Sequence, residues 1–322
     1  MMNRRDVLLA AAASAIPTSR ALAQANWPSK PIRIIVPYPP GGSSDIIARA
    51  ISQPLQESIR QTVIVENRAG ANGNVGAELV ARSAPDGTTL LLCDTGALAI
   101  SPSVYTKLAF DPGKDLRGVT MLAYSPHLLV VHPSIPANNL KELVALSKTR
   151  NLNFAVSAVG GAPHLAGVAV ERASGAKWQY VPYKGGAQAI QDTIGGQTEV
   201  MMNGMLATIP HVQSGKLKVL GVSKKTRMPL IADVPTIAEQ GVPGFESGTW
   251  QGALVASGTP QPILDRLNAE LIKAIRSPDV RARLAGQGAE VVTMTPAEQD
   301  RFFHQERARW AQVVAQANIK LD

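Results

Sequence analysis

The chain has 322 residues, 45% of them apolar and 17% charged, which is typical of a globular protein with room for two ordinary domains. Its net charge of +8 is spread along the chain without a helix-turn-helix, zinc or RNA-binding motif, and only 4% of residues are aromatic, so nucleic acid is not expected as a partner. The single cysteine, Cys93, excludes an intrachain disulfide; it lies in an apolar run where a buried, inert thiol is expected.

The N-terminus has the pattern of an export signal. An arginine pair at residues 4–5 precedes an apolar stretch over residues 7–16, and the small residues of a cleavage site follow just before Gln24. We therefore expect residues 1–23 to be removed as a signal peptide and the mature protein to lie in the periplasm. The arginine pair also resembles a twin-arginine signal. A retained anchor is the alternative, although the apolar stretch is too short to cross a bilayer.

The first predicted strand, residues 32–36, leads into a loop that contains two glycines and two serines. This loop runs from Tyr38 to Asp45, and apolar residues recur at helical spacing after it, so a helix is expected to begin at Ser43 or Ser44. Glycines let backbone N–H groups turn outward, and the positive end of the helix dipole points the same way. The arrangement predicts an anion-binding site; the alternative is that the glycine pair only ends the strand.

After this loop, strands and helices alternate, which implies a parallel or mixed α/β sheet. Strands are expected at residues 63–65 and 88–93 and a helix at 76–82. Asn72 lies in a glycine- and asparagine-rich loop before that helix. Pro54 interrupts the preceding helical pattern, so that helix is expected to kink or stop there. Thr95 follows the third strand, at the end where open α/β sheets bind their ligands.

The order of strand, glycine pair and helix start occurs twice more along the chain. One case follows a predicted strand at residues 153–156, and the other precedes a predicted helix at residues 187–194. The residues involved are Ser157, Gly160, Gly161 and His164 in the first case, and Lys184, Gly185 and Gly186 in the second. Three occurrences are harder to attribute to coincidental strand ends than one.

A long run of β-forming residues, 119–132, is expected to carry the chain across to a second domain. The remaining expected elements are strands at residues 199–202, 218–222 and 252–256, and helices at residues 139–147, 263–275, 279–285 and 296–317. Asn203 lies at the end of the first of these strands, and a proline-rich segment precedes the last one. We therefore predict discontinuous domains, with residues 24–124 and 248–322 in the first and residues 125–247 in the second.

The glycine loops match no nucleotide-binding or hydrolase motif. The chain lacks the Gly-Lys-Ser/Thr of a phosphate loop, the spaced glycines of the dinucleotide fingerprint and a Gly-x-Ser-x-Gly elbow. Its five histidines show no metal-ligand spacing, so neither a metal nor a cofactor is expected. His164 is the histidine at a predicted ligand-facing helix start. For His164, the alternative to a ligand contact is an ordinary structural histidine. For Lys184, the alternative to an anion contact is a solvated loop lysine.

Several short motifs together resemble the Bug family, the extracytoplasmic substrate-binding receptors of tripartite tricarboxylate transporters. They are PYPPGGSSD at residues 37–45, VENRAGANGN at 65–74, DG at 86–87, YKGG at 183–186, DVPT at 233–236 and GTP at 258–260. The resemblance covers the mature chain and implies the type II periplasmic binding protein fold, in which crossover strands join two α/β domains with the ligand between them. It also implies that the first-strand loop and the loop ending at His164 grip a carboxylated ligand, partly through ordered water.

The candidate ligand-binding residues come from these loops and strand ends. They are Tyr38, Gly41, Gly42, Ser43, Ser44, Asp45, Asn72, Thr95, Ser157, Gly160, Gly161, His164, Lys184, Gly185 and Asn203. One departure from the family pattern is Gly161, three residues before the histidine, where the family often has Ser or Thr. This departure puts direct hydroxyl contacts from that loop in doubt and leaves the ligand's identity open.

We hypothesise a monomeric binding protein, not an enzyme, that captures a small carboxylate or related polar metabolite and delivers it to a membrane permease. An exported enzyme on the same scaffold is one alternative, but no nucleophile–base pair is visible in the sequence. A ligand-sensing partner of a membrane receptor is another, because the same clamp would serve both.

The loops around Gly42 and Gly161 contain no Arg or Lys, so no bidentate guanidinium clamp is expected from them. Backbone N–H groups at opposing helix starts, aided by serine hydroxyls and water, are expected to hold the anion. Asp45 is assigned to the helix dipole, or to a cationic group on the ligand, rather than to the carboxylate.

Overall fold

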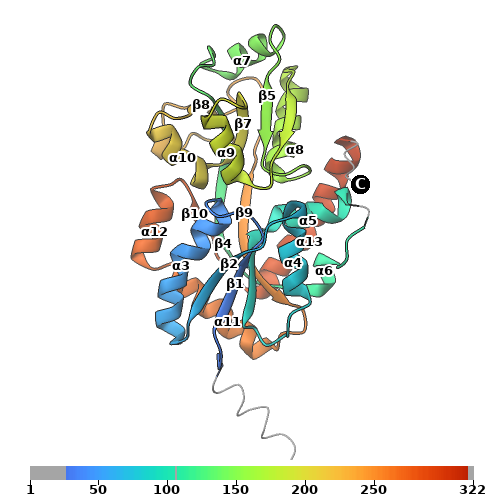
Figure 1. Ribbon diagram of the computed structural model, residues 1–322, viewed down its shortest axis with the longest axis vertical. Coiled ribbons are helices and arrows are strands. Elements are labelled where there is room, and N and C mark those ends of the chain that lie inside the picture. The colour runs from blue at the N-terminus through green and yellow to red at the C-terminus, as the bar shows by residue number, and fades with distance from the viewer. Residues whose placement is uncertain (1–26, 106, 318–322) are drawn as a thin grey trace, which may run out of the picture.

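The protein consists of two stacked parts joined by two long strands, as a computed structural model of residues 27–105 and 107–317 shows (Figure 1). The predicted signal peptide, residues 1–23, lies outside the described residues. Within these described ranges, no helix is long and apolar enough to cross a membrane.

The strands form one mixed sheet in the order β2-β1-β3-β9-β4-β7-β5-β6, with β10 and β8 also paired to β4. Their bounds are β1 (Ile32–Val36), β2 (Val63–Asn67), β3 (Thr89–Asp94), β4 (Leu116–Val131), β5 (Asn153–Val156), β6 (Gln179–Pro182), β7 (Val200–Gly204), β8 (Lys218–Val222), β9 (Gly248–Ala256) and β10 (Glu290–Val291). Strands β1–β3 pair in parallel, as do β5–β7, whereas β4 and β9 run antiparallel to their neighbours. The predicted α/β class with a mixed sheet is confirmed.

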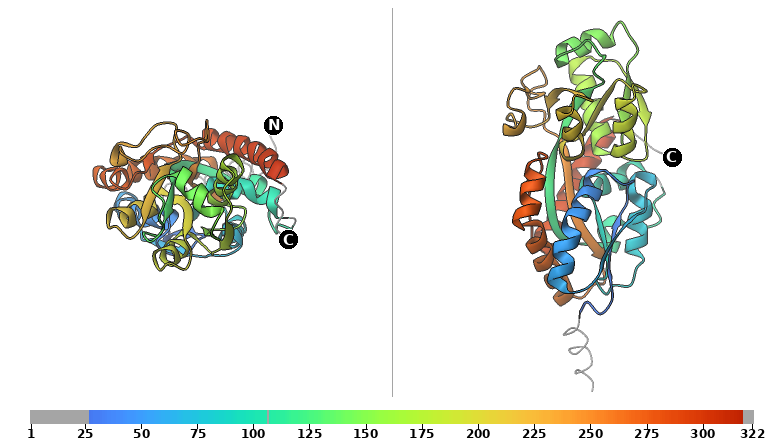
Figure 2. Two further views of the ribbon diagram at one scale, coloured as in Figure 1. Left: turned by 90° about the horizontal axis from the view of Figure 1, so that it is seen from above. Right: turned by 60° about the vertical axis from the view of Figure 1, so that its left-hand side comes forward.

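Strand β4 is shared by two parts of this sheet. Its residues from Leu116 to Pro126 pair with β9, and those from His127 to Val131 pair with β7 and β8. Nearly all of its side chains are buried, in keeping with an apolar strand that has neighbours on both edges. We call β1–β3, β9, β10 and the first part of β4 the first half, and the remaining strands the second half; Figure 2 shows β4 and β9 passing between them.

Helices cover both faces of each half. Their bounds are α3 (Ser43–Ile59), α4 (Asn74–Ala81), α5 (Thr95–Val104), α6 (Pro112–Asp115), α7 (Leu140–Ser147), α8 (Ala162–Ser174), α9 (Gly186–Ile194), α10 (Met205–Gln213), α11 (Gln261–Ile275), α12 (Pro278–Ala285) and α13 (Pro296–Ala317), with short 3₁₀ turns η1 (Ala71–Gly73) and η2 (Pro229–Ile231). Helix α3 continues through Pro54 to Ile59, so of the two expected outcomes, a kink or a stop, the stop does not occur. Helices α5, α6 and α10 are additional to those that the sequence pattern predicts.

The C-terminal segment packs on the first half. Leu264 and Leu267 of α11 share a buried cluster with Ile34 of β1 and Ile47 of α3. Phe303 of α13 lies in a second cluster with residues of β3, β9 and α4. The second half has its own cores, one of them centred on aromatic rings of β5 and β6. Each half therefore buries its own apolar surface, which is the main source of its stability.

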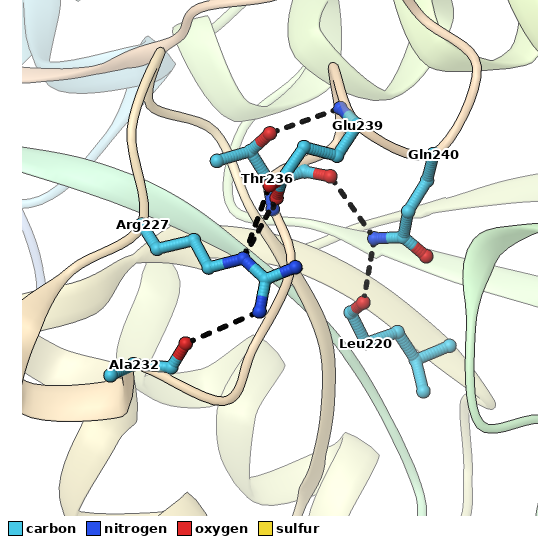
Figure 3. A network of polar contacts seen from close by, with 6 residues as sticks. All are labelled: Leu220, Arg227, Ala232, Thr236, Glu239 and Gln240. Carbon is cyan, nitrogen blue, oxygen red and sulfur yellow. Dashed lines mark hydrogen bonds and ion pairs between the residues drawn. The ribbon is translucent and has the colours of Figure 1, made fainter.

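A polar network fixes the irregular segment between β8 and β9 (Figure 3). The backbone N–H of Thr236 donates to the Glu239 carboxylate at 2.6 Å, and the N–H of Glu239 donates back to the Thr236 hydroxyl at 3.0 Å. Arg227 holds the same carboxylate, and Gln240 donates to the Leu220 carbonyl at 2.9 Å. The motif at residues 233–236 is thus the start of a reciprocally capped turn, which ties this segment to β8.

Candidate ligand-binding site

A cleft between the two halves encloses about 550 Å³, part of it open to solvent. It is lined by residues of loops and strand ends from both halves: Tyr38, Gly42, Ser43, Ser44, Asn72, Asp94, Ala97, Ser157, Ala158, Gly161, Ala162, Pro163, Gly185, Gly186, Asn203, Gly204, Thr249 and Gln251. The predicted residues among these are Tyr38, Gly42, Ser43, Ser44, Asn72, Ser157, Gly161, Gly185 and Asn203. Residues separated by more than two hundred positions are therefore brought together by the fold.

Four helices begin at this cleft, each with a glycine as its N-cap. The N-caps are Gly42 for α3, Gly161 for α8, Gly185 for α9 and Gly204 for α10, and all four line the cleft. Glycine has no side chain to accept from the first-turn N–H groups, so these helices lack a cap from their own N-cap residue; in α10 the Leu206 N–H donates instead to the Ser125 hydroxyl at 2.9 Å. Together with the positive ends of the helix dipoles, the first-turn N–H groups make the cleft suited to an anion.

The glycines also let the two halves approach closely. A Cβ at Gly185 would lie 2.6 Å from Cδ of Pro39, in the loop of the first half. A Cβ at Gly161 would lie 3.4 Å from the Asn72 side-chain oxygen, and one at Gly204 would lie 3.0 Å from the Ser43 hydroxyl. A Cβ at Gly185 would therefore hold the halves apart, and one at Gly204 would displace the Ser43 hydroxyl, whereas the distance at Gly161 is an ordinary contact.

Asp45 lies behind the first glycine loop. Its carboxylate accepts from the Gly41 N–H at 2.9 Å, from Nε of Arg49 at 3.0 Å and from Nδ2 of Asn67 at 3.0 Å. Burial opposes its charge, but these three donors together hold the pKa of Asp45 below its usual value. The Gly41 N–H is therefore occupied within the protein, and neither Gly41 nor Asp45 lines the cleft.

The other predicted residues outside the cleft wall support it or lie on the surface. Nδ1 of His164 accepts from the Gly160 N–H at 2.9 Å, and burial lowers the pKa of this histidine to about 4. Thr95 is fully buried, with its hydroxyl 4.0 Å from the sulfur of Met121. Lys184 is exposed. The structure thus gives His164 a part in shaping the glycine loop from behind.

Polar side chains of the cleft come from both halves. The Ser44 hydroxyl donates to Oε1 of Gln251 at 2.7 Å, and both side chains are buried. Asn203 donates weakly to the Thr208 hydroxyl at 3.3 Å. Nδ2 of Asn72 is buried and has no hydrogen-bond partner within the described part of the chain. A buried amide without a partner is costly, so this group is a donor available to a ligand or water.

Asp94 is a cleft residue that the sequence analysis did not select, although it directly precedes the chosen Thr95. It ends the buried strand β3 and forms the N-cap of α5, where its carboxylate accepts from the Gly96 N–H at 3.0 Å. Burial raises the pKa of Asp94 to about 7, against the opposing effect of backbone hydrogen bonds from Gly96, Trp250 and Ala97. The signal available in the sequence was its place at the carboxyl end of a buried strand.

The described lining of the cleft contains no Lys, Arg or His. Within residues 27–105 and 107–317, no group of His, Cys, Asp and Glu side chains is arranged to hold a metal ion. Recognition of an anion here would therefore depend on backbone N–H groups and neutral side chains.

Comparison with known proteins gives a consistent result for the whole chain. The sequence profile of the family described as "Tripartite tricarboxylate transporter family receptor" matches residues 47–319. Protein BugT of Bordetella pertussis is 36% identical over 318 residues, covering 98% of this chain and 96% of its own length. A UPF0065 protein from the tcbD-tcbE intergenic region of Pseudomonas sp. (strain P51) is 35% identical over 323 residues, covering 99% and 96%.

Solved structures of similar sequence have the same fold. The periplasmic binding protein BugD superposes with a TM-score of 0.87 at 32% identity, covering 91% of this chain and 99% of that one. The R. palustris protein Rpa4515 with adipate gives 0.88 at 32% identity, with 91% and 99% covered. MatC from Rhodopseudomonas palustris with bound malate gives 0.84 at 32% identity, with 89% and 100% covered. The fold of a periplasmic binding protein, expected from the sequence, is confirmed.

Proposed function

Because the chain belongs to the tripartite tricarboxylate transporter receptor family, we propose that it captures a small carboxylate in its cleft and delivers it to the membrane permease of a tripartite transporter. The observation that carries this proposal is the set of four glycine-capped helix starts, α3, α8, α9 and α10, around a cleft lined without cations. Such an arrangement stabilises a compact anion through many weak donors, and it admits neutral polar groups beside it.

The ligands of similar proteins support the proposal that this chain binds a carboxylate. One relative was solved with adipate and another with malate, and both molecules are dicarboxylates. We propose that one carboxylate lies at the glycine-capped helix starts. Ser43, Asn72 and Asn203 then offer side-chain donors or acceptors to the rest of the ligand.

We propose that the two halves act as separate domains that close on the ligand. The division runs through β4 and β9, with residues 24–124 and 248–322 in one domain and residues 125–247 in the other. Packing of α11 and α13 against the β1–β3 side supports it, as does the separate aromatic core of the second half.

We further propose export of the mature chain to the periplasm, where it acts as a monomer, and binding without chemical change of the ligand. The arginine pair, apolar stretch and small residues before Gln24 support export. N-terminal sequencing of periplasmic protein is expected to begin at Gln24, and a mature protein that keeps its first methionine would contradict the signal-peptide part of the proposal.

Native mass spectrometry of the purified protein is the direct test of carboxylate capture. The protein is incubated in turn with adipate, with malate, and with neutral and cationic compounds of similar size. We expect one dicarboxylate per chain, a rise in the unfolding temperature, and an unchanged ligand after release. Binding of only neutral or cationic compounds would contradict carboxylate recognition, and conversion of the ligand would contradict a receptor role.

A further inference from the structure

The cleft that we propose for an anion contains an acid. Asp94 is buried, with 7% of its surface exposed, and it lines the same cleft as the four glycine-capped helix starts. Helix α5 also starts beside the cleft, and there the N-cap is Asp94 itself, whose carboxylate accepts from the Gly96 N–H. An ionised Asp94 would repel a carboxylate ligand, so its presence there needs an explanation.

The groups around Asp94 do not neutralise its charge. Tyr38 faces it from the loop after β1, and Cys93 precedes it on β3; burial raises the pKa of both groups well above their usual values, so both are uncharged. From α13, the charged side chain that acts on Asp94 is Glu306, a second carboxylate. From β9 and α5 it receives only backbone N–H groups, those of Trp250, Gly96 and Ala97.

In these surroundings, Asp94 can be protonated and uncharged near neutral pH. Burial and the Glu306 charge both raise the pKa of Asp94, which stands at about 7 in the ligand-free protein. A carboxylate ligand in the same cleft adds a further negative charge, which favours protonation again. A protonated carboxyl group also becomes a hydrogen-bond donor, which is what a ligand anion requires.

We propose that Asp94 is a proton-donating ligand contact: in its protonated form it donates its O–H to a carboxylate oxygen of the bound ligand. Where Asp94 is ionised before binding, one proton is taken up from solvent with each ligand. This inference rests on the proposed carboxylate-binding function and adds a rule of specificity to it. The site favours anions, because protonation removes the negative charge with which Asp94 would attract a cationic group.

Linkage gives the size of the effect. The fraction of ionised Asp94 in the free protein sets the number of protons taken up, about 0.1 per ligand at pH 6 and about 0.9 at pH 8. The association constant is accordingly expected to fall about 30-fold between pH 6 and pH 8.5.

The experiment is calorimetric titration of the mature protein with adipate, and with malate as a second probe, at pH 6, 7, 8 and 8.5. Two buffers of different ionisation enthalpy at each pH give the number of protons exchanged. The variant Asp94→Asn is uncharged at every pH and keeps a side-chain donor, so we expect its affinity to be nearly independent of pH and its proton uptake to be near zero.

The matched control is Asp111→Asn. Asp111 caps α6 and accepts from the Gly113 N–H at 2.9 Å, as Asp94 does from Gly96, but it lies outside the cleft. We expect this variant to keep the wild-type pH dependence. Circular dichroism shows whether the Asp94→Asn protein is folded. If it is not, the number of protons taken up by the wild-type protein on binding still tests the proposal.

Two results would overturn the inference. Tight binding of either probe at pH 8 with no proton uptake would show that Asp94 stays ionised in the complex, as would affinity that rises with pH. A wild-type protein that binds neither probe at any of these pH values counts instead against carboxylate capture, and it removes the basis of this inference as well.

Discussion

Asp45 shows how a single carboxylate organises the first glycine loop without facing the cleft. It is 4% exposed, and its oxygens accept from a backbone N–H of the loop and from side chains of α3 and β2. The loop conformation that presents Gly42 to the cleft is thus fixed from behind. Asp45 is the acidic residue in the first turn of α3, at the positive end of the helix dipole, and its carboxylate already accepts three hydrogen bonds within the protein.

The substitution Asp45→Asn is expected to lower the free energy of unfolding at pH 7 by about 1–3 kcal/mol, because an amide nitrogen then faces the donors of Gly41 and Arg49. The pKa of Asp45 is held below its unfolded value, so its contribution is present above that value and is lost as pH falls through the folded pKa. Urea unfolding at pH 7 and pH 3 checks this, with the exposed Asp233→Asn as control. An equal loss at both pH values would contradict the assignment.

The helix starts differ in how far local sequence predicts them. Helices α3, α8 and α9 follow a strand and a glycine pair, and an amphipathic pattern marks each of them. Helix α5 is buried on nearly all sides and contains Pro102, so it has no helical periodicity to distinguish it from a strand. Helix α10 likewise has an apolar first turn and an internal proline. Among the helices that begin at the cleft, the two starts that the local pattern misses are those fixed by tertiary burial.

The capped turn between β8 and β9 gives a second prediction. Thr236 is 1% exposed, and its hydroxyl accepts from the Glu239 N–H (Figure 3). We expect Thr236→Val to lower the free energy of unfolding by about 1 kcal/mol, because an oxygen acceptor of a capping box is replaced by a methyl group. Thr236→Ser, which keeps the hydroxyl, is the control for thermal unfolding. A valine variant as stable as the serine variant would contradict the role of this turn.

Some residues of the cleft can be predicted from the sequence, and others cannot. The glycine loops share a local pattern, and therefore Gly42, Gly161 and Gly185 were found from sequence. Thr249 and Gln251 were missed, because they reach the cleft through the antiparallel pairing of β9 with β3, which aligns Gln251 with Asp94. Strand alternation indicates which face a side chain takes, but it does not identify a partner strand more than 150 residues away.

The approach of the two halves gives a prediction at Gly185. Its backbone suits any residue, but a Cβ would lie 2.6 Å from Cδ of Pro39 across the cleft. We expect Gly185→Ala to weaken carboxylate binding about tenfold by opposing closure, with little change in the stability of the open protein. Gly195→Ala, at the other end of α9 with ordinary contacts, is the matched control. Small-angle scattering with saturating ligand checks closure; a fully closed Gly185→Ala complex would contradict this.

The central claim is that backbone N–H groups at helix starts, rather than a side-chain cation, hold the anion. The most direct test of this claim is calorimetric titration of Gly42→Val and of Lys184→Ala with a dicarboxylate that the wild-type protein binds. Valine fits the backbone at Gly42, where a Cβ meets nothing closer than the Pro39 carbonyl at 3.9 Å, so its side chain occupies the cleft without disturbing the fold. We expect this variant to lose measurable binding and Lys184→Ala, which removes an exposed charge, to bind within about fivefold of wild type. Loss of binding in Lys184→Ala together with intact binding in Gly42→Val would contradict the account.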